Sequence, residues 1–277
     1  MLSVLNTQLF RLKKSKLFWA MIIVCAALPL LGVLLTSTIA NAISSLMGEE
    51  GSEILQLLQG EGGYLTLMQL GSLTELGSDP ALFSLIASSI FLSGEFTSGA
   101  IRNMVLANKN RTQIFLSFLC VALIIGFACF GASYVSTLLF YGVVIGFDGV
   151  TVAKALTGCF STLFLGLLTI ALVQACVCFF LFITRKTGGT VAFPLLVIIF
   201  APSVMNTIVN IVTIVKAMGG QTVSAAALSW VPLYNMSQFQ AASIDGALIG
   251  KIVLYNAPLA ALFAFFGWFA LDKSDIK

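Results

Sequence analysis

Hydrophobic residues recur in six long runs along the chain, and short polar segments separate the runs. Each run approaches or exceeds the roughly 20 mainly apolar residues that an α-helix needs to cross a bilayer. We therefore predict an all-α integral membrane protein. Its six transmembrane helices are expected over residues 17–40, 80–97, 112–143, 155–183, 190–215 and 251–271.

The first run follows a basic segment and so has the general form of a signal peptide. The apolar core of a signal peptide typically has about 7–15 residues, and this run is longer. We interpret it as a retained membrane anchor, and both interpretations give it the same orientation.

The segment 1–16 combines leucines at near-helical spacing with basic side chains. Leu2, Leu5, Leu9 and Leu12 share one face, and Arg11 lies beside them. This pattern predicts a cytoplasmic amphipathic helix that lies on the membrane surface with its apolar face toward lipid. The alternative is a frayed basic tail.

Two further segments are expected outside the cell. Residues 41–79 carry six acidic and no basic side chains around two apolar stretches, which predicts a small extracellular helical cap. Residues 216–250 form a second extracellular segment, in which Trp230 and Tyr234 are suited to the membrane interface. Residues 272–277 form a short cytoplasmic tail.

Charge supports this topology. Only 9% of the 277 residues are charged, whereas a soluble domain carries roughly 25%. With the N-terminus inside, only Lys154, Lys216 and Lys251 of the fourteen basic residues lie outside. The positive-inside rule then places both ends of the chain in the cytoplasm, and we expect the protein in the cell membrane.

Several function classes are disfavoured by what the sequence lacks. It has no histidine, no nucleotide-binding P-loop and no ionisable residue near the middle of a predicted span. Catalysis by the chain itself, a metal site and proton-coupled transport are therefore not expected. The net charge of +3 is too small to suggest nucleic acid, and we expect the six cysteines, all in apolar runs, to pack as small hydrophobic residues.

Neutral polar residues within the predicted spans are the candidates for a substrate path. They are Gln174, Asn206 and Asn210. Hydrogen bonding between helices is the favoured explanation for all three, and substrate contact is the alternative.

The segment 98–111 joins the second and third predicted spans. Gly99 can end a helix, and Ile101, Met104 and Val105 then fall on one face of a short helical turn. Such a compact amphipathic turn suits docking into a groove on a cytoplasmic partner.

This stretch resembles a motif of ABC-2 type transporter permeases. Glu95-x-x-x-Gly99-Ala100-Ile101-Arg102-Asn103, followed by Arg111-x-x-Ile114, is similar to their E-x-x-x-G-T-I-R-N…R-x-x-I pattern. The chain departs from that pattern in two places. It has Ala100 where threonine is common, and Asn108-Lys109-Asn110 where a proline-containing turn is frequent.

The resemblance implies a function as well as a topology. The segment 98–111 would be a coupling helix that contacts a separate ATPase, and two copies of the chain would join two ATPase subunits that bind ATP and Mg²⁺. Glu95 would hold the loop, Arg102 and Arg111 would contact acids of the ATPase, and Ile101, Met104 and Val105 would fill its groove. Asn103 and Gly99 complete the predicted coupling set.

We therefore expect the permease subunit of an exporter. The acidic outer segment favours amphipathic peptides, as in bacteriocin export, or other hydrophobic compounds as the substrate. Two alternatives stay open, a channel or secondary carrier that works alone and an immunity-type protein that binds a peptide without transporting it.

Overall fold

The computed structural model describes residues 2–35, 38, 42, 62–101, 104, 110–144, 150–218 and 246–273. All regular structure in these residues is helical, with no strand among them. The helices are α1 (Leu2–Lys14), the helix Lys16–Leu35, α3 (Gly62–Ser72), α4 (Asp79–Thr97), α6 (Arg111–Val144), α7 (Val152–Thr184), α8 (Thr187–Met218) and α11 (Gly246–Asp272). The predicted fold class is confirmed for this part of the chain.

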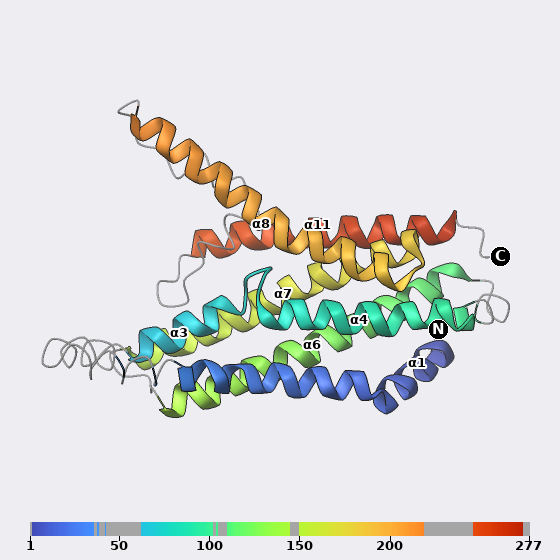
Figure 1. Ribbon diagram of the computed structural model, residues 1–277, viewed down its shortest axis with the longest axis horizontal. Coiled ribbons are helices and arrows are strands. Elements are labelled where there is room, and N and C mark those ends of the chain that lie inside the picture. Colours follow the sequence, from blue (N-terminus) through green and yellow to red (C-terminus); the bar gives the residue numbers. More distant parts are fainter. Residues whose placement is uncertain are drawn as a thin grey trace, which may run out of the picture.

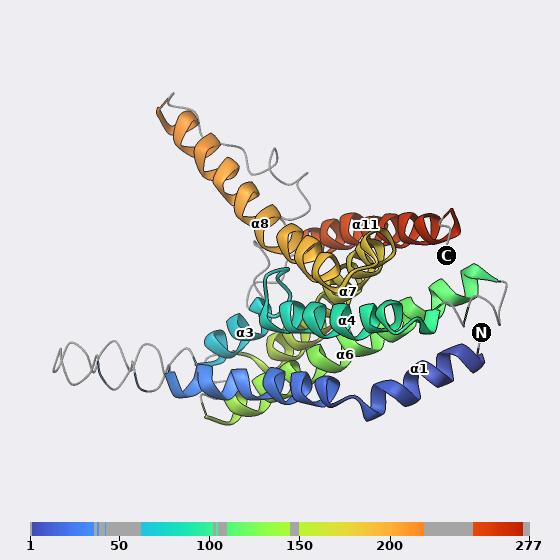
Figure 2. The ribbon, with the colours of Figure 1, turned by 45° about the vertical axis from the view of Figure 1, so that its right-hand side comes forward.

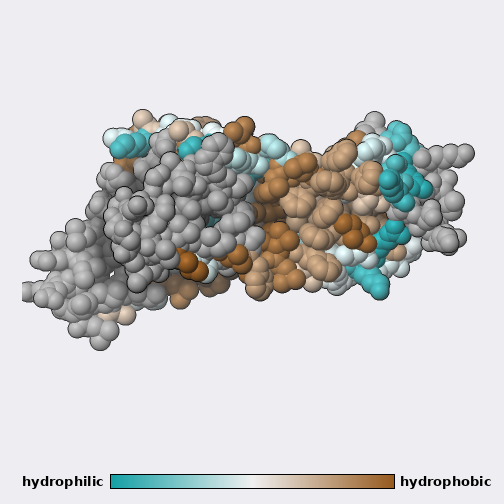
Figure 3. All heavy atoms as spheres, turned by 90° about the horizontal axis from the view of Figure 1, so that it is seen from above, coloured by the Kyte–Doolittle hydropathy of each residue, from teal (hydrophilic) through white to brown (hydrophobic). Residues whose placement is uncertain are grey.

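Five of the described helices are long and apolar enough to cross a membrane. They are Lys16–Leu35, Asp79–Thr97, Arg111–Val143, Val152–Thr184 and Gly246–Asp272. A shorter apolar stretch, Thr187–Phe200, begins α8. A hydrophobic band crosses the described surface, and hydrophilic side chains gather toward the end that holds the termini (Figure 3). The chain is therefore a multi-pass α-helical membrane protein.

The helices lie side by side in an elongated bundle, and both termini lie at the same end of it (Figures 1 and 2). We call this the terminal end. Helix α7 is the centre of the bundle, because it contacts α3, α4, α6, α8 and α11. The first part of α8 packs on α4 and α7, and its remainder runs away from the bundle (Figure 2).

Two glycines allow α6 and α7 to approach closely. A Cβ atom on Gly126 of α6 would lie 2.5 Å from the Ile170 side chain of α7. A Cβ atom on Gly166 of α7 would overlap the Phe130 ring of α6. Small residues of this kind let membrane helices gain packing contacts, which drive their association in lipid.

A proline in α8 explains one contact between α4 and α8. Pro194 has no backbone N–H, so the carbonyl of Thr190, four residues earlier, lacks its helical donor. The buried hydroxyl of Ser89 in α4 donates to that carbonyl at 3.0 Å. The bond therefore satisfies a group that would otherwise be unpaired inside the membrane.

Helix α3 belongs to the segment for which a helical cap is predicted. It lies along the sides of α6 and α7, in line with α4, from which the residues 73–78 separate it (Figure 1). Leu67 and Leu70 are fully buried in the same hydrophobic cluster as Phe130 and Leu165. These leucines pack on α6 and α7, and the extracellular position of the cap stays a prediction. Residues 43–61 lie outside the described residues.

The close packing at Gly166 predicts that a larger side chain there lowers stability more than the same side chain at Gly131. Gly166→Val should lower the free energy of unfolding by about 1–3 kcal/mol, because the new methyl groups overlap the Phe130 ring. Gly131→Val on α6 is the matched control, since nothing lies within 4 Å of its Cβ position. Thermal unfolding in detergent measures both variants. Equal loss of stability in the two would contradict the packing described.

Candidate functional site

The segment 98–110 joins α4 to α6 at the terminal end, and we call this connecting segment the hairpin. It begins with a glycine turn. The amide of Ser98 donates to the Gly94 carbonyl at 3.0 Å, and the amide of Gly99 donates to the Phe96 carbonyl at 3.1 Å. Gly99 has φ +70°, a left-handed conformation that glycine adopts without strain. The expectation that Gly99 ends the helix is confirmed.

Ile101 turns into the protein after this glycine. Its side chain is only 3% exposed and belongs to a cluster with Leu12 of α1 and with Ile114 and Phe118 of α6. Met104 packs against the same cluster. In this conformation Ile101 is not available to fill a groove on a partner, which corrects that expectation. Its burial fixes the base of the hairpin to the bundle.

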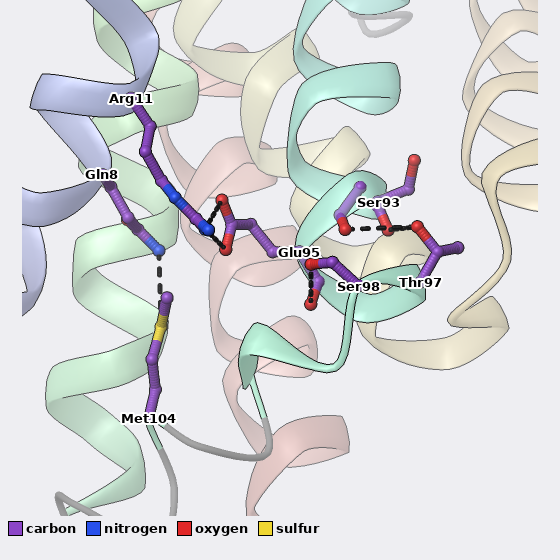
Figure 4. A network of polar contacts seen from close by, with 8 residues as sticks. Gln8, Arg11, Ser93, Glu95, Thr97, Ser98 and Met104 are labelled. Atoms are coloured by element: carbon purple, nitrogen blue, oxygen red, sulfur yellow. Dashed lines mark hydrogen bonds and ion pairs between the residues drawn. The ribbon is translucent and has the colours of Figure 1, made fainter.

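An ion pair joins the end of α4 to α1. One nitrogen of Arg11, Nη1, lies 2.7 Å from Oε1 and 2.6 Å from Oε2 of Glu95 (Figure 4). The side chain of Glu95 is only 6% exposed, whereas that of Arg11 is 47% exposed. The pair therefore neutralises a nearly buried carboxylate. Glu95 does hold neighbouring structure together, and its partner lies 84 residues earlier in the chain.

The apolar face of α1 also packs on protein. Leu12 is buried, and Leu5 and Leu9 pack against the cluster that contains Ile101. Gln8, fully buried on this face, places Nε2 4.0 Å from the Met104 sulfur (Figure 4). The prediction that these leucines face lipid is wrong, because α6 and the hairpin occupy that side.

The other end of the hairpin is tied to α11. The Arg111 guanidinium donates to the carbonyls of Leu271, at 3.3 Å, and Asp272. A cation here interacts favourably with the negative end of the helix dipole. The indole of Trp268 donates to the Thr112 hydroxyl at 3.1 Å. In this conformation Arg111 therefore binds within the chain, whereas we expected it to contact acids of a partner.

These contacts define a polar clasp at the terminal end. It consists of Gln8 and Arg11 of α1, Glu95 of α4, Met104 of the hairpin, Arg111 and Thr112 of α6 and Trp268 of α11. Of the predicted coupling set, the structure brings Glu95, Gly99, Ile101, Met104 and Arg111 to this region. Arg102, Asn103 and Val105 lie outside the described residues.

Four clasp residues were missed by the sequence prediction. They are Gln8, Arg11, Thr112 and Trp268. Residues 5, 8 and 12 share one face of a helix, so a glutamine between two leucines could have indicated a buried polar contact. No local signal identifies Glu95 as the partner of Arg11.

Gln174 lies apart from the clasp, in the interior between α4 and α7. It is fully buried, and its Nε2 donates to the Ser84 hydroxyl at 3.1 Å, while its Oε1 has no partner among the described residues. This contact supports the interhelical role that we favoured. The side chains of Asn206 and Asn210 lie outside the described residues, so their role stays a prediction.

The described residues do not gather metal ligands. No group of three or more His, Cys, Asp or Glu side chains in this part of the chain is placed to hold a metal ion. The clasp itself is suited to holding helices together and offers no nucleophile paired with a base.

Comparisons with known proteins give no family assignment. No family model matches the chain, and no curated protein matches it at a significant level.

The ion pair predicts that replacing Arg11 lowers stability more than replacing Glu95. Arg11→Met should destabilise the protein by about 1–3 kcal/mol, because it leaves the nearly buried Glu95 carboxylate without its cation. Glu95→Gln should have a smaller effect, because water can still solvate the half-exposed Arg11. Lys13→Met on the same helix is the control for loss of charge. Thermal unfolding in detergent tests the order, and an equal effect of the two variants would contradict it.

Gln174 gives a second prediction. Gln174→Leu removes one hydrogen bond and also a buried carbonyl oxygen without a described partner, so stability should change by no more than about 1 kcal/mol. Ser84→Ala should lower stability more, because it leaves the Gln174 amide without its acceptor. A large loss of stability in Gln174→Leu alone would show that its oxygen has a partner.

Proposed function

We propose that this chain is the permease subunit of an ATP-driven exporter. A separate ATPase would act on it through the segment 98–111. The observation that carries the proposal is the clasp, because it connects this hairpin to helices from both ends of the sequence. The resemblance of residues 95–114 to the ABC-2 permease motif supports the same conclusion.

The clasp offers a route for mechanical force. The ion pair joins the end of α4, just before the hairpin, to α1 and so to the helix Lys16–Leu35. Arg111 and Trp268 join the start of α6, just after the hairpin, to α11. The contacts of Ser89 and Gln174 extend the connection from α4 to α8 and α7. A push on the hairpin would therefore move several helices together, because these contacts connect both of its ends directly to other helices.

The proposed topology has six spans with both ends in the cytoplasm. The positive-inside count supports it, and so does the position of both termini at one end of the bundle. In the complete transporter, two copies of this chain would associate with two ATPase subunits. ATP and Mg²⁺ would be bound by the ATPase, which would carry out the phosphoryl transfer.

Amphipathic peptides or other hydrophobic compounds are the proposed substrates. The acidic residues of the segment 41–79 would attract cationic compounds on the outer side. A channel or carrier that works alone is less well supported, since the predicted spans lack ionisable residues near their middles.

Charge reversal in the hairpin tests the coupling. Arg102→Glu should reduce the ATPase activity that substrate stimulates in a reconstituted complex by about tenfold, which corresponds to about 1.4 kcal/mol of lost interaction. Lys186→Glu, in the exposed turn between α7 and α8, is the control. The ATPase subunit to reconstitute is one that co-purifies with the chain or is encoded beside it.

Two outcomes would overturn the proposal. One is unchanged stimulation in Arg102→Glu. The other is transport of a cationic peptide by the purified chain without any ATPase, which would identify a carrier. Peptide binding without transport in the presence of the ATPase would favour the immunity-type alternative.

A further inference from the structure

Helices α3 and α4 form one line that residues 73–78 interrupt (Figures 1 and 2). Both helices pack on α6 and α7, and Leu73 and Leu76 of the interruption are buried in the same cluster as Leu70 and Leu85. The interruption is thus part of the bundle. We call residues 73–78 the break.

The break is level with the middle of α7. The hydroxyl of Thr169 donates to the Thr74 carbonyl at 3.0 Å, and Thr169 is near the centre of α7, which runs over Val152–Thr184.

Lipid-facing surface continues beyond the break, away from the terminal end. Leu31 and Leu35 of the first span are 54% and 61% exposed. Val143 of α6 and Phe160 of α7 are 79% and 71% exposed. Large apolar side chains exposed on three neighbouring helices are typical of lipid-facing surface. They favour a position of the break at the depth of the membrane.

Polar groups at the break are exposed at this depth. The Glu75 and Asp79 side chains and Gly77 are exposed, and neither carboxylate forms an ion pair with a described residue. A charged side chain in lipid costs about 2.5–3.5 kcal/mol even on the smaller scale, and irregular backbone in a membrane is found where protein or water covers it. Lipid alone cannot satisfy these groups.

We propose that water reaches the break from the side of the membrane opposite the terminal end. Residues 62–97 then form one discontinuous membrane-crossing segment, with a hydrated recess at its interruption. The recess is lined by Glu75, Gly77 and Asp79. This inference goes beyond the proposed function, because it concerns solvent access and holds for an exporter, a carrier or a binding protein.

Cysteine accessibility tests the recess. Gly77→Cys is placed in a chain whose six native cysteines are changed to alanine, and open space surrounds its Cβ position. Intact cells are treated with a membrane-impermeant, cationic methanethiosulfonate reagent. Ile90→Cys, on the exposed lipid side of the continuous helix α4, is the matched control, and Gly94→Cys marks the terminal end.

The expected result is labelling of Gly77→Cys from outside, on the order of tenfold or more faster than Ile90→Cys, because a thiol in hydrocarbon stays protonated and unreactive. Gly94→Cys should react only after the cells are opened. Labelling of Gly77→Cys only in detergent, or only from the cytoplasmic side, would overturn the inference.

Hydrogen–deuterium exchange of the unmodified chain in nanodiscs provides a second measurement, which does not depend on a variant folding. Amides of residues 75–78 should exchange much faster than those of residues 84–92. Equally slow exchange in both segments would also overturn the inference. Neither measurement involves transport or an ATPase, so failure here is distinct from failure of the proposed function.

Discussion

The close approach of α6 and α7 is the constraint on which the rest of the bundle depends. In lipid there is little hydrophobic drive for helices to associate, so packing and interhelical hydrogen bonds must hold them together. Gly126 and Gly166 provide that packing, because each removes a side chain where the facing helix lies. Helices α3, α4, α8 and α11 also contact α7.

Charge is arranged around this apolar frame and is concentrated at the terminal end. There the nearly buried carboxylate of Glu95 pairs with Arg11, and Arg111 donates to the last carbonyls of α11. These contacts join segments that lie up to 161 residues apart in sequence. Hydrogen bonds and an ion pair thus join the helices at the end of the bundle that would meet a cytoplasmic partner. At the centre of the bundle, side-chain packing holds the helices together.

Much of this could be predicted from hydrophobicity, because a span must be a long apolar helix. The predicted span 80–97 corresponds to α4 and 155–183 to α7, each within three residues at either end. Hydrophobicity does not tell whether an apolar face meets lipid or protein. For this reason the leucines of α1 were expected to face lipid, whereas they pack on protein. The pairing of Arg11 with Glu95 depends on the folded arrangement and has no local pattern.

The bond between Ser89 and Thr190 makes two distant positions interdependent. Ser89 is needed because Pro194 leaves a carbonyl open, so an alanine at 194 would restore the helical donor and make the serine dispensable. A change at position 89 would therefore be tolerated only after Pro194 has been replaced, whereas Pro194 could change first. The proline in α8 in this way determines which residue is needed at position 89 of α4.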